Sequence, residues 1–81
     1  MELEPANRKP LELRIGSRCA DFMWMFRENG LDHYKHIVTR RYLILDAKGR
    51  SYMRRDGNMV RASFRKEFRR VVEGVGARIV G

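Results

Sequence analysis

The sequence predicts a small α+β domain, in which two helices pack on an antiparallel sheet built around a β-hairpin over residues 37–55. Three observations predict this class. The length of 81 residues suits one domain with a thin core. Residues 37–46 are rich in β-branched and aromatic side chains and end in a turn sequence, and apolar residues recur at helical spacing after residue 60. The finer expectation is the order β-α-β-β-α-β of a ferredoxin-like unit.

The first residues are expected to form a loose leader, and the remainder a single domain. Pro5 and Pro10 disfavour regular helix, because proline lacks an amide hydrogen and restricts the residue before it. We therefore assign residues 1–10 to the leader and residues 11–81 to the domain. Within the domain, residues 11–15 (LELRI) alternate apolar and charged side chains, which predicts a first strand.

A first helix is expected over residues 18–29. Ser17 is a favourable N-cap, and Gly30 is a favourable residue at a helix C-terminus. The apolar run Phe22–Phe26 would cover every side of this helix, so a single stripe facing the sheet does not account for it. Either these side chains fill the core of a small domain, or the helix makes a homodimer contact through Trp24.

The hairpin turn is the most specific local prediction. Asp46 and Gly49 suit the first and last positions of a type I turn followed by a G1 bulge. The resulting register places Ile44 opposite Tyr52, Leu43 opposite Met53, Tyr42 opposite Arg54 and Arg41 opposite Arg55. Because strand side chains alternate, one face of the hairpin is the expected core face and carries Leu43, Leu45 and Met53. The other face is expected to carry Arg40, Tyr42, Ile44, Arg50, Tyr52 and Arg54.

A second helix is expected over residues 60–73, after a turn at residues 56–58. Its apolar residues are spaced by three and four and would face the sheet. Arginines and a lysine occupy the remaining circumference. Gly74 and Gly76 are expected to end this helix, and a short last strand is expected at residues 78–80.

The positive charge of the chain is confined to its C-terminal part. The formal net charge is +8. Residues 1–36 carry equal numbers of basic and acidic side chains, whereas residues 37–81 carry twelve Lys and Arg against four Asp and Glu. A positive field of this kind is typical of domains that bind nucleic acid or another anionic surface, although a solubilising face has the same composition.

The sequence therefore predicts a small basic protein that binds RNA or DNA without catalysis. Tyrosine rings on the hairpin can stack on the bases of a single strand, and arginines can contact its phosphates. The alternative is that the tyrosines pack beneath another element and the arginines are solvated at its rim. The second helix offers a further row of arginines one turn apart. The candidate binding residues are Arg40, Arg41, Tyr42, Arg50, Tyr52, Arg54, Arg55, Arg61, Arg65 and Arg69.

Two other function classes are kept as alternatives. The protein could be an interaction module or small inhibitor that binds an acidic protein surface. It could also be a small toxin-like ribonuclease with His33 and His36 as acid and base, since imidazole titrates near neutral pH. On a helix these histidines could share a metal ion, but no His-Glu-x-x-His or Cys-x-x-Cys pattern is present. We expect no cofactor, no metal site and no dedicated catalytic residue.

The chain is expected to be cytoplasmic and to stay out of the membrane. Its single cysteine, Cys19, cannot form an internal disulfide. The longest apolar run, Phe22–Phe26, is far shorter than the roughly 20 residues that cross a bilayer. The first residues also lack the apolar centre of a secretory signal.

Overall fold

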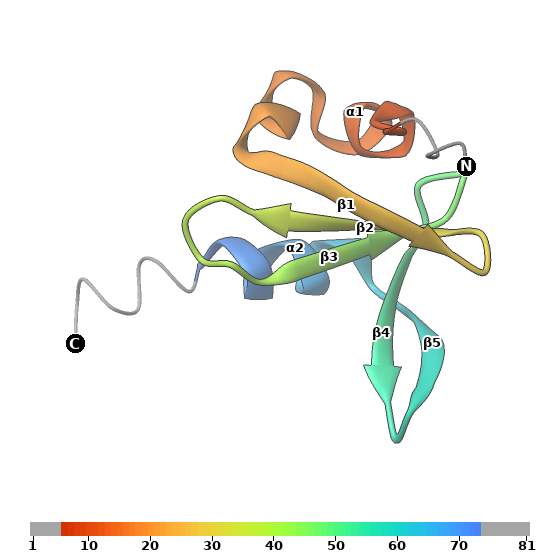
Figure 1. Cartoon of the computed structure of the whole chain (residues 1–81). Helices are drawn as coiled ribbons and strands as arrows, with labels where there is room; N and C mark the ends of the chain where they lie inside the picture. Colours follow the sequence, from red (N-terminus) through yellow and green to blue (C-terminus); the bar gives the residue numbers. More distant parts are fainter. Residues whose placement is uncertain (1–5, 74–81) are drawn as a thin grey trace.

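The computed structural model describes residues 6–73, which form an α+β domain with one antiparallel sheet (Figure 1). The five strands lie in the sheet in the order β1-β2-β3-β4-β5. The elements are α1 (Lys9–Ile15), the 3₁₀ helix η1 (Gly16–Asp21), β1 (Phe22–Glu28), β2 (Leu31–His36), β3 (Tyr42–Leu45), β4 (Ser51–Arg55), β5 (Asn58–Ala62) and α2 (Phe64–Val72). The α+β class is confirmed. The ferredoxin-like order is not, because the helices flank the strands in sequence instead of alternating with them.

The first two expected elements are wrong. Residues 11–15, expected as a strand, lie in α1, and residues 18–29, expected as a helix, form most of η1 and β1. Pro10 is tolerated in the first turn of α1, because amide hydrogens there have no helical partner. Gly16 ends α1 with a φ of 58°, in the left-handed region that favours glycine.

The apolar run at the start of β1 divides between the two faces of the sheet. Phe22 and Trp24 contribute to the core. A bulge between Trp24 and Phe26 inserts one extra residue, which returns Phe26 to the face that carries Met23. Met23 and Phe26 stay 48% and 42% exposed. Consecutive apolar residues in this run therefore reflect a strand with apolar side chains on both of its faces. They do not surround a helix.

Two two-residue turns of the sheet each contain a glycine with positive φ, and one of them includes Gly30, which was expected to end a helix over residues 18–29. Asn29 and Gly30 join β1 to β2, and Asp56 and Gly57 join β4 to β5. All four residues have positive φ, of 52° and 76° in the first turn and of 49° and 81° in the second. Such pairs are typical of the two-residue turns that match the twist of a β-hairpin. Gly30 therefore closes a hairpin and does not end a helix.

The second helix begins later than expected. Residues 58–62 form β5, and α2 begins at Phe64. Ser63 is its N-cap, and the Ser63 hydroxyl accepts a hydrogen bond from the Lys66 amide at 3.4 Å. The strand expected at residues 78–80 lies outside the described residues.

The turn between β3 and β4 is confirmed, but the ladder beyond it is short. The Gly49 amide donates to the Asp46 carbonyl at 2.9 Å. The paired residues are Ile44 with Tyr52 and Leu45 with Ser51. The further pairs of the expected register do not form in the described sheet, and Arg41 does not come opposite Arg55. Instead β4 pairs along its whole length with β5, and this hairpin projects from the rest of the sheet (Figure 1).

The hydrophobic core lies between one face of the sheet and the helices. Side chains from β1, β2 and β3 point into it at alternate positions, and α1 and α2 each supply a buried residue. Its buried members are Leu11, Phe22, Tyr34, Leu43, Leu45 and Val71. Leu43 and Leu45 are therefore core residues, as expected, whereas Met53 is only half-buried.

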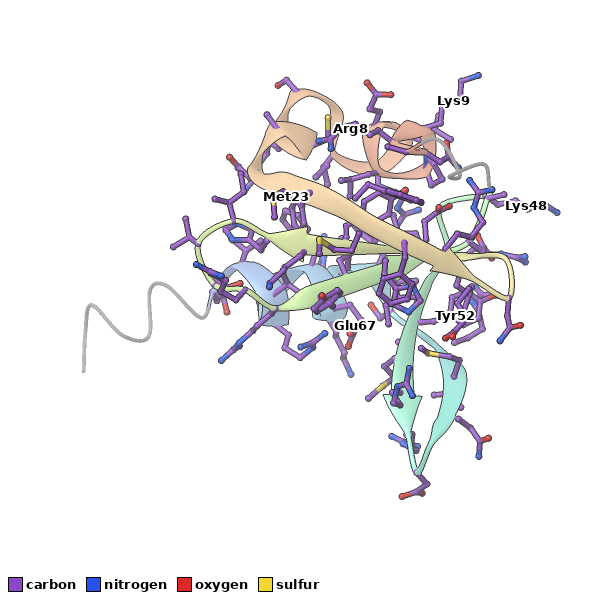
Figure 2. All side chains as sticks on the ribbon, viewed as in Figure 1. Arg8, Lys9, Met23, Lys48, Tyr52 and Glu67 are labelled. Carbon is purple, nitrogen blue, oxygen red and sulfur yellow. The ribbon has the colours of Figure 1, made fainter. Side chains whose placement is uncertain are left out.

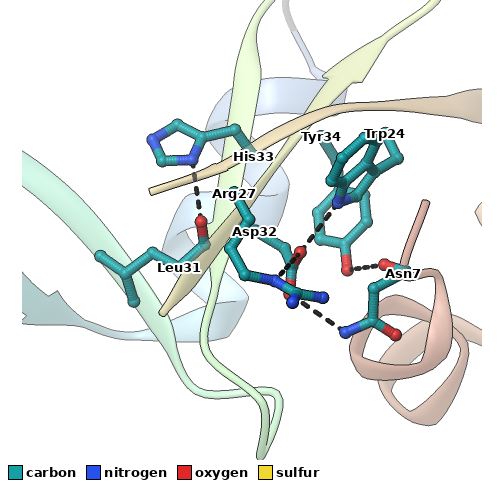
Figure 3. A network of polar contacts seen from close by, with 7 residues as sticks. All are labelled: Asn7, Trp24, Arg27, Leu31, Asp32, His33 and Tyr34. Carbon is teal, nitrogen blue, oxygen red and sulfur yellow. Dashed lines mark hydrogen bonds and ion pairs between the residues drawn. The ribbon is translucent and has the colours of Figure 1, made fainter. Parts of the chain in front are cut away.

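A buried carboxylate connects β1, β2 and the residues before α1 (Figure 3). Asp32 on β2 is 1% exposed. It accepts hydrogen bonds from Trp24 Nε1 at 2.8 Å, Arg27 Nε at 3.0 Å and Asn7 Nδ2 at 3.2 Å. The Tyr34 hydroxyl donates to the Asn7 carbonyl at 2.6 Å. Burial, together with the Asp32 carboxylate, raises the pKa of Tyr34 well above its ordinary value.

Residues within the stretch predicted as a leader also contact the domain. Asn7 belongs to the Asp32 network, and Pro10 is buried. The Arg8 guanidinium donates to the carbonyl of Cys19 in η1 and, at 3.1 Å, to that of Phe22 in β1. These bonds hold the start of α1 against the first strand.

Replacing Asp32 with alanine is expected to destabilise the domain by about 2–3 kcal/mol, because the Trp24 indole and the partly buried Arg27 guanidinium lose their shared acceptor. Urea unfolding of the purified protein measures this change. Glu28→Ala is the matched control, since it removes an exposed carboxylate from the neighbouring strand. Equal midpoints for the two variants would show that the buried network contributes little.

Candidate nucleic-acid interface

The face of the sheet opposite the core carries aromatic, apolar and basic side chains. The strand registers align them across the sheet at positions that alternate with the core residues. We call this surface the open face, and it carries Met23, Phe26, His33, Lys35, Tyr42, Ile44 and Tyr52. The Tyr and Ile residues expected on the outer face of the hairpin are therefore joined by side chains from β1 and β2.

The open face is hollowed where β3 and β4 diverge. The cavity has a volume of about 630 Å³, and α2 contributes to its wall. We call it the open-sheet hollow. Its apolar and aromatic lining residues are Phe26, His33, Tyr42, Ile44, Tyr52 and Met53. Its charged lining residues are Arg41, Arg54, Glu67 and Arg70. A cavity of this size lies in the range that accommodates a small organic group such as a nucleotide.

The rings of the hollow are held in fixed relative positions. Phe26 and His33 stack with their centroids 4.2 Å apart and an angle of 20° between the rings. Tyr42 meets His33 edge-on, at 6.5 Å and 70°. Phe26 keeps much of its surface exposed, whereas Tyr42 and Tyr52 are half-buried. Exposed aromatic surface on a sheet is suited to stacking against a flat ligand.

The cations around the hollow differ in how strongly the protein holds them. Arg70 donates to Glu67 Oε1 at 2.9 Å and to the Tyr42 carbonyl at 3.0 Å. Arg41 donates to the Arg70 carbonyl at 2.7 Å. Within residues 6–73, the Arg54 guanidinium forms no ion pair and no hydrogen bond. Arg54 is therefore the cation of the hollow that is most available to an external anion.

Asp46 positions one wall of the hollow by holding Tyr52. The Asp46 carboxylate accepts hydrogen bonds from the amides of Lys48 and Arg50, both at 2.9 Å, and from Arg50 Nε at 2.7 Å. It also accepts one from the Tyr52 hydroxyl at 3.0 Å. Burial alone would raise the pKa of Asp46, but these hydrogen bonds outweigh it and lower the pKa to about 2.

A second basic surface lies on the other flank of α2, between that helix and α1 with η1. The Phe64 and Phe68 rings stack there with centroids 5.6 Å apart. The Arg14 guanidinium lies 4.1 Å from the centre of the Phe64 ring, and that of Arg18 lies 5.0 Å from the centre of the Phe68 ring. Together with Arg65 and Arg69 these residues line a groove of about 640 Å³, here called the arginine–phenylalanine groove.

The ten candidate residues predicted from sequence do not form one continuous site. The hollow contains Arg41, Tyr42, Tyr52 and Arg54, and Arg61 lies 5.9 Å from the centre of the Tyr52 ring. The arginine–phenylalanine groove contains Arg65 and Arg69, and Arg69 is 3.7 Å from Glu73. The other three lie in neither cavity: Arg40 in the β2–β3 turn, Arg50 paired with Asp46, and Arg55 at the end of β4.

Five residues of the hollow were not assigned to the binding site by the sequence analysis. They are Phe26, His33, Met53, Glu67 and Arg70. His33 was considered only as a catalytic residue, and Met53 was expected on the core face. Phe26 and His33 were missed because their strands were not recognised, and the turn sequence Asn29-Gly30 was the signal that would have revealed both strands. Glu67 and Arg70 carry no local signal, since they occupy positions of α2 that also suit a solvated helical face.

The two histidines lie on opposite faces of β2. His33 belongs to the open face, whereas His36 is buried against Phe22 with the rings edge-on and 5.0 Å apart. The amides of Val38 and Thr39 both donate to His36 Nδ1 at 3.2 Å. The two imidazoles therefore do not meet at one substrate. Among residues 6–73, no group of three or more His, Cys, Asp or Glu side chains is arranged to hold a metal ion.

The protein is thus a small α+β domain with an antiparallel meander sheet, and it carries two cavities lined by basic and aromatic side chains. Comparisons with protein-family models, with curated proteins and with solved structures found no match for this chain. In the described part of the chain, no helix has the length and apolar character needed to span a membrane.

The Asp46→Asn substitution is expected to remove a pH-dependent part of the stability. The folded pKa of about 2 lies below the ordinary value of 3.8, so this carboxylate stabilises the fold above pH 3.8 and loses that effect as the pH falls toward 2. The difference in unfolding free energy between wild type and variant is therefore expected to shrink over this interval. Urea unfolding at several pH values measures it, with the exposed Asp21→Asn as control. A difference that stays constant with pH would contradict this role.

Proposed function

We propose that this protein binds single-stranded RNA or DNA without catalysis, through the open-sheet hollow. The observation that carries this proposal is the meeting of half-buried tyrosine rings, an exposed phenylalanine and an unpaired arginine in one cavity on a sheet face. Single strands are commonly bound in this way, because their unstacked bases can stack on aromatic rings while cations contact the phosphates.

The expected energetics follow from these two kinds of contact. Each base stacked on a ring contributes roughly 1–3 kcal/mol and tolerates any base, since every base has a flat face. Phosphate contacts add affinity that falls with salt, because binding releases counterions from the nucleic acid. The net charge of +8 favours both the encounter and this salt dependence.

The arginine–phenylalanine groove supports contact with a strand longer than one nucleotide. It presents Arg65 and Arg69 on the flank of α2 that faces away from the hollow. The row of arginines expected on the second helix therefore serves a separate surface. A strand held in the hollow would have to pass around α2 to reach it, so the two surfaces are expected to bind different segments.

An interaction module for an acidic protein is the second candidate. The observation in its favour is the apolar surface of β1, where Met23, Met25 and Phe26 are exposed. Lys35 of β2 lies opposite Met23 in the sheet. Such residues can anchor a partner protein. A homodimer contact through Trp24 was one expectation from the sequence. Trp24 is not part of this exposed surface, because it packs on the core and donates a hydrogen bond to Asp32.

Fluorescence anisotropy with a short labelled oligonucleotide tests the proposed function. Affinity is expected to fall at least about ten-fold between about 50 and 200 mM salt. Tyr42→Leu is expected to weaken binding about five-fold or more by removing a stacking ring, and Arg54→Gln to reduce the slope of affinity against salt by about one phosphate contact.

Lys9→Gln is the control for Arg54→Gln, because it removes the same charge from α1, away from Tyr52 and Glu67 (Figure 2). Tyr52→Phe is expected to retain binding, since it keeps the ring. Absence of salt-sensitive binding, or equal losses for Arg54→Gln and Lys9→Gln, would contradict the proposal. A protein partner that is retained after nuclease treatment would favour the second candidate.

A further inference from the structure

The arginine–phenylalanine groove brings exposed arginines together from two sides. Arg14 and Arg18 come from α1 and η1, and Arg65 and Arg69 come from α2. All of these side chains are exposed. Within residues 6–73, the guanidinium groups of Arg14, Arg18 and Arg65 form no ion pair and no hydrogen bond. The groove therefore offers accessible hydrogen-bond donors that all carry positive charge.

The protein supplies little negative charge to balance these arginines. Among the described residues that line the groove, Glu73 is the one carboxylate. It lies 3.7 Å from Arg69, and the two side chains are 69% and 64% exposed. An ion pair in this position is screened by water and contributes little. Guanidinium groups that converge in this way repel one another, so an external anion in the groove would relieve the repulsion.

Arg14 is held in place at two points along its side chain. Its guanidinium carbon lies 4.1 Å from the centre of the Phe64 ring, and its aliphatic stem packs on Gly49 in the β3–β4 turn. A Cβ atom at residue 49 would come within 3.1 Å of Arg14 Cδ, so a side chain there would displace the stem. A guanidinium stacked on a ring keeps its N–H donors at its edge. Arg14 is therefore positioned by the protein while its donors stay free.

The phenylalanine rings of the groove are less accessible to a base than the rings of the hollow. Arg14 lies over the Phe64 ring, and Arg18 lies over the Phe68 ring. Both rings are half-buried and pack against the core, and they stack on each other with an angle of 17° between them. Little ring face remains for a base, whereas the edges of the guanidinium groups stay accessible. The groove thus presents cations where the hollow presents rings.

The groove and the hollow use different flanks of α2 and share no lining residue. Arg65 and Arg69 line the groove, whereas Glu67 and Arg70 line the hollow. Successive residues of an α-helix are rotated by about 100°, so these two pairs project in different directions. A ligand in one cavity therefore leaves the other cavity accessible.

The geometry points to a second nucleic-acid site in the arginine–phenylalanine groove, which binds the phosphate backbone without stacking on the bases. Several guanidinium groups in one groove require a row of anions, and a nucleic-acid backbone supplies one at every nucleotide. Arg65 and Arg69 are one helical turn apart, so they can contact different phosphates of one strand. This inference rests on the proposed nucleic-acid binding and deepens it, because it assigns contacts to bases and contacts to the backbone to two separate surfaces.

Fluorescence anisotropy with an abasic oligonucleotide, whose sugar–phosphate backbone carries no bases, tests the inference. This strand keeps its phosphates but cannot stack in the hollow. The double variant Arg14→Gln with Arg18→Gln is expected to weaken its binding and to lower the slope of log affinity against log salt by about 1.4, at about 0.7 for each phosphate contact. The loss of affinity between about 50 and 200 mM salt is then about seven-fold smaller than for the wild type. Tyr42→Leu is expected to leave binding of the abasic strand unchanged, since no base is stacked.

The double variant Lys9→Gln with Lys48→Gln is the matched control. It removes two positive charges from exposed residues that line neither cavity (Figure 2). It is expected to keep the salt slope of the wild type for the abasic strand. If the first double variant does not fold, Arg65→Gln with Arg69→Gln repeats the test from the α2 wall of the groove, with the same expected change of slope.

The groove site and the proposed function can fail separately. Equal effects of the arginine and lysine double variants on the abasic strand would assign its binding to net charge and would overturn the groove site. The proposed function would still stand if Tyr42→Leu weakens binding of an ordinary oligonucleotide. Binding of polyglutamate through the groove arginines, without binding of the abasic strand, would assign the groove to an acidic protein and would also overturn the inference. Absence of ordinary oligonucleotide binding at low salt would overturn the proposed function itself.

Discussion

The burial of the Asp32 carboxylate is the constraint on which the arrangement of the sheet depends. A buried charge is tolerated only when it is well paired, and Asp32 meets this condition through Trp24 Nε1, Arg27 Nε and Asn7 Nδ2. These donors come from β1 and from the residues before α1, so the network fixes both against β2. Side chains of a strand alternate, and a shift by one residue would exchange its two faces. Holding Asp32 inward therefore places His33 on the open face.

The divergence of β3 and β4 produces the candidate site. The turn that Asp46 stabilises brings the two strands together over only two residue pairs. Beyond these pairs β4 joins β5, which satisfies its backbone groups without β3. Glu67 and Arg70 of α2 contribute to the wall of the hollow that lies there. A continuous hairpin would have brought Arg41 and Arg55 side by side, with like charges repelling, and would have left no room for this cavity.

The basic charge of the chain has two roles in this structure. Some arginines are structural, because Arg50 is paired with Asp46, Arg70 with Glu67, and Arg41 with a backbone carbonyl. Others, such as Arg54 and Arg65, lie in the two cavities without an ion pair in the described part of the chain. A high net charge therefore overstates the number of cations offered to a ligand, and the position of each guanidinium decides its role.

The sequence by itself determined the features that depend on neighbouring residues. The turn from Asp46 to Gly49, the core positions of Leu43 and Leu45, and the apolar stripe of α2 follow from local backbone preferences and side-chain spacing. Only the tertiary structure decided that Phe22–Phe26 is a strand and that β4 leaves β3 for β5, because each choice depends on which distant segment supplies the hydrogen bonds. The same holds for the hollow, because its lining residues come from β1, β2, β3, β4 and α2 and surround one cavity only after these elements have packed together.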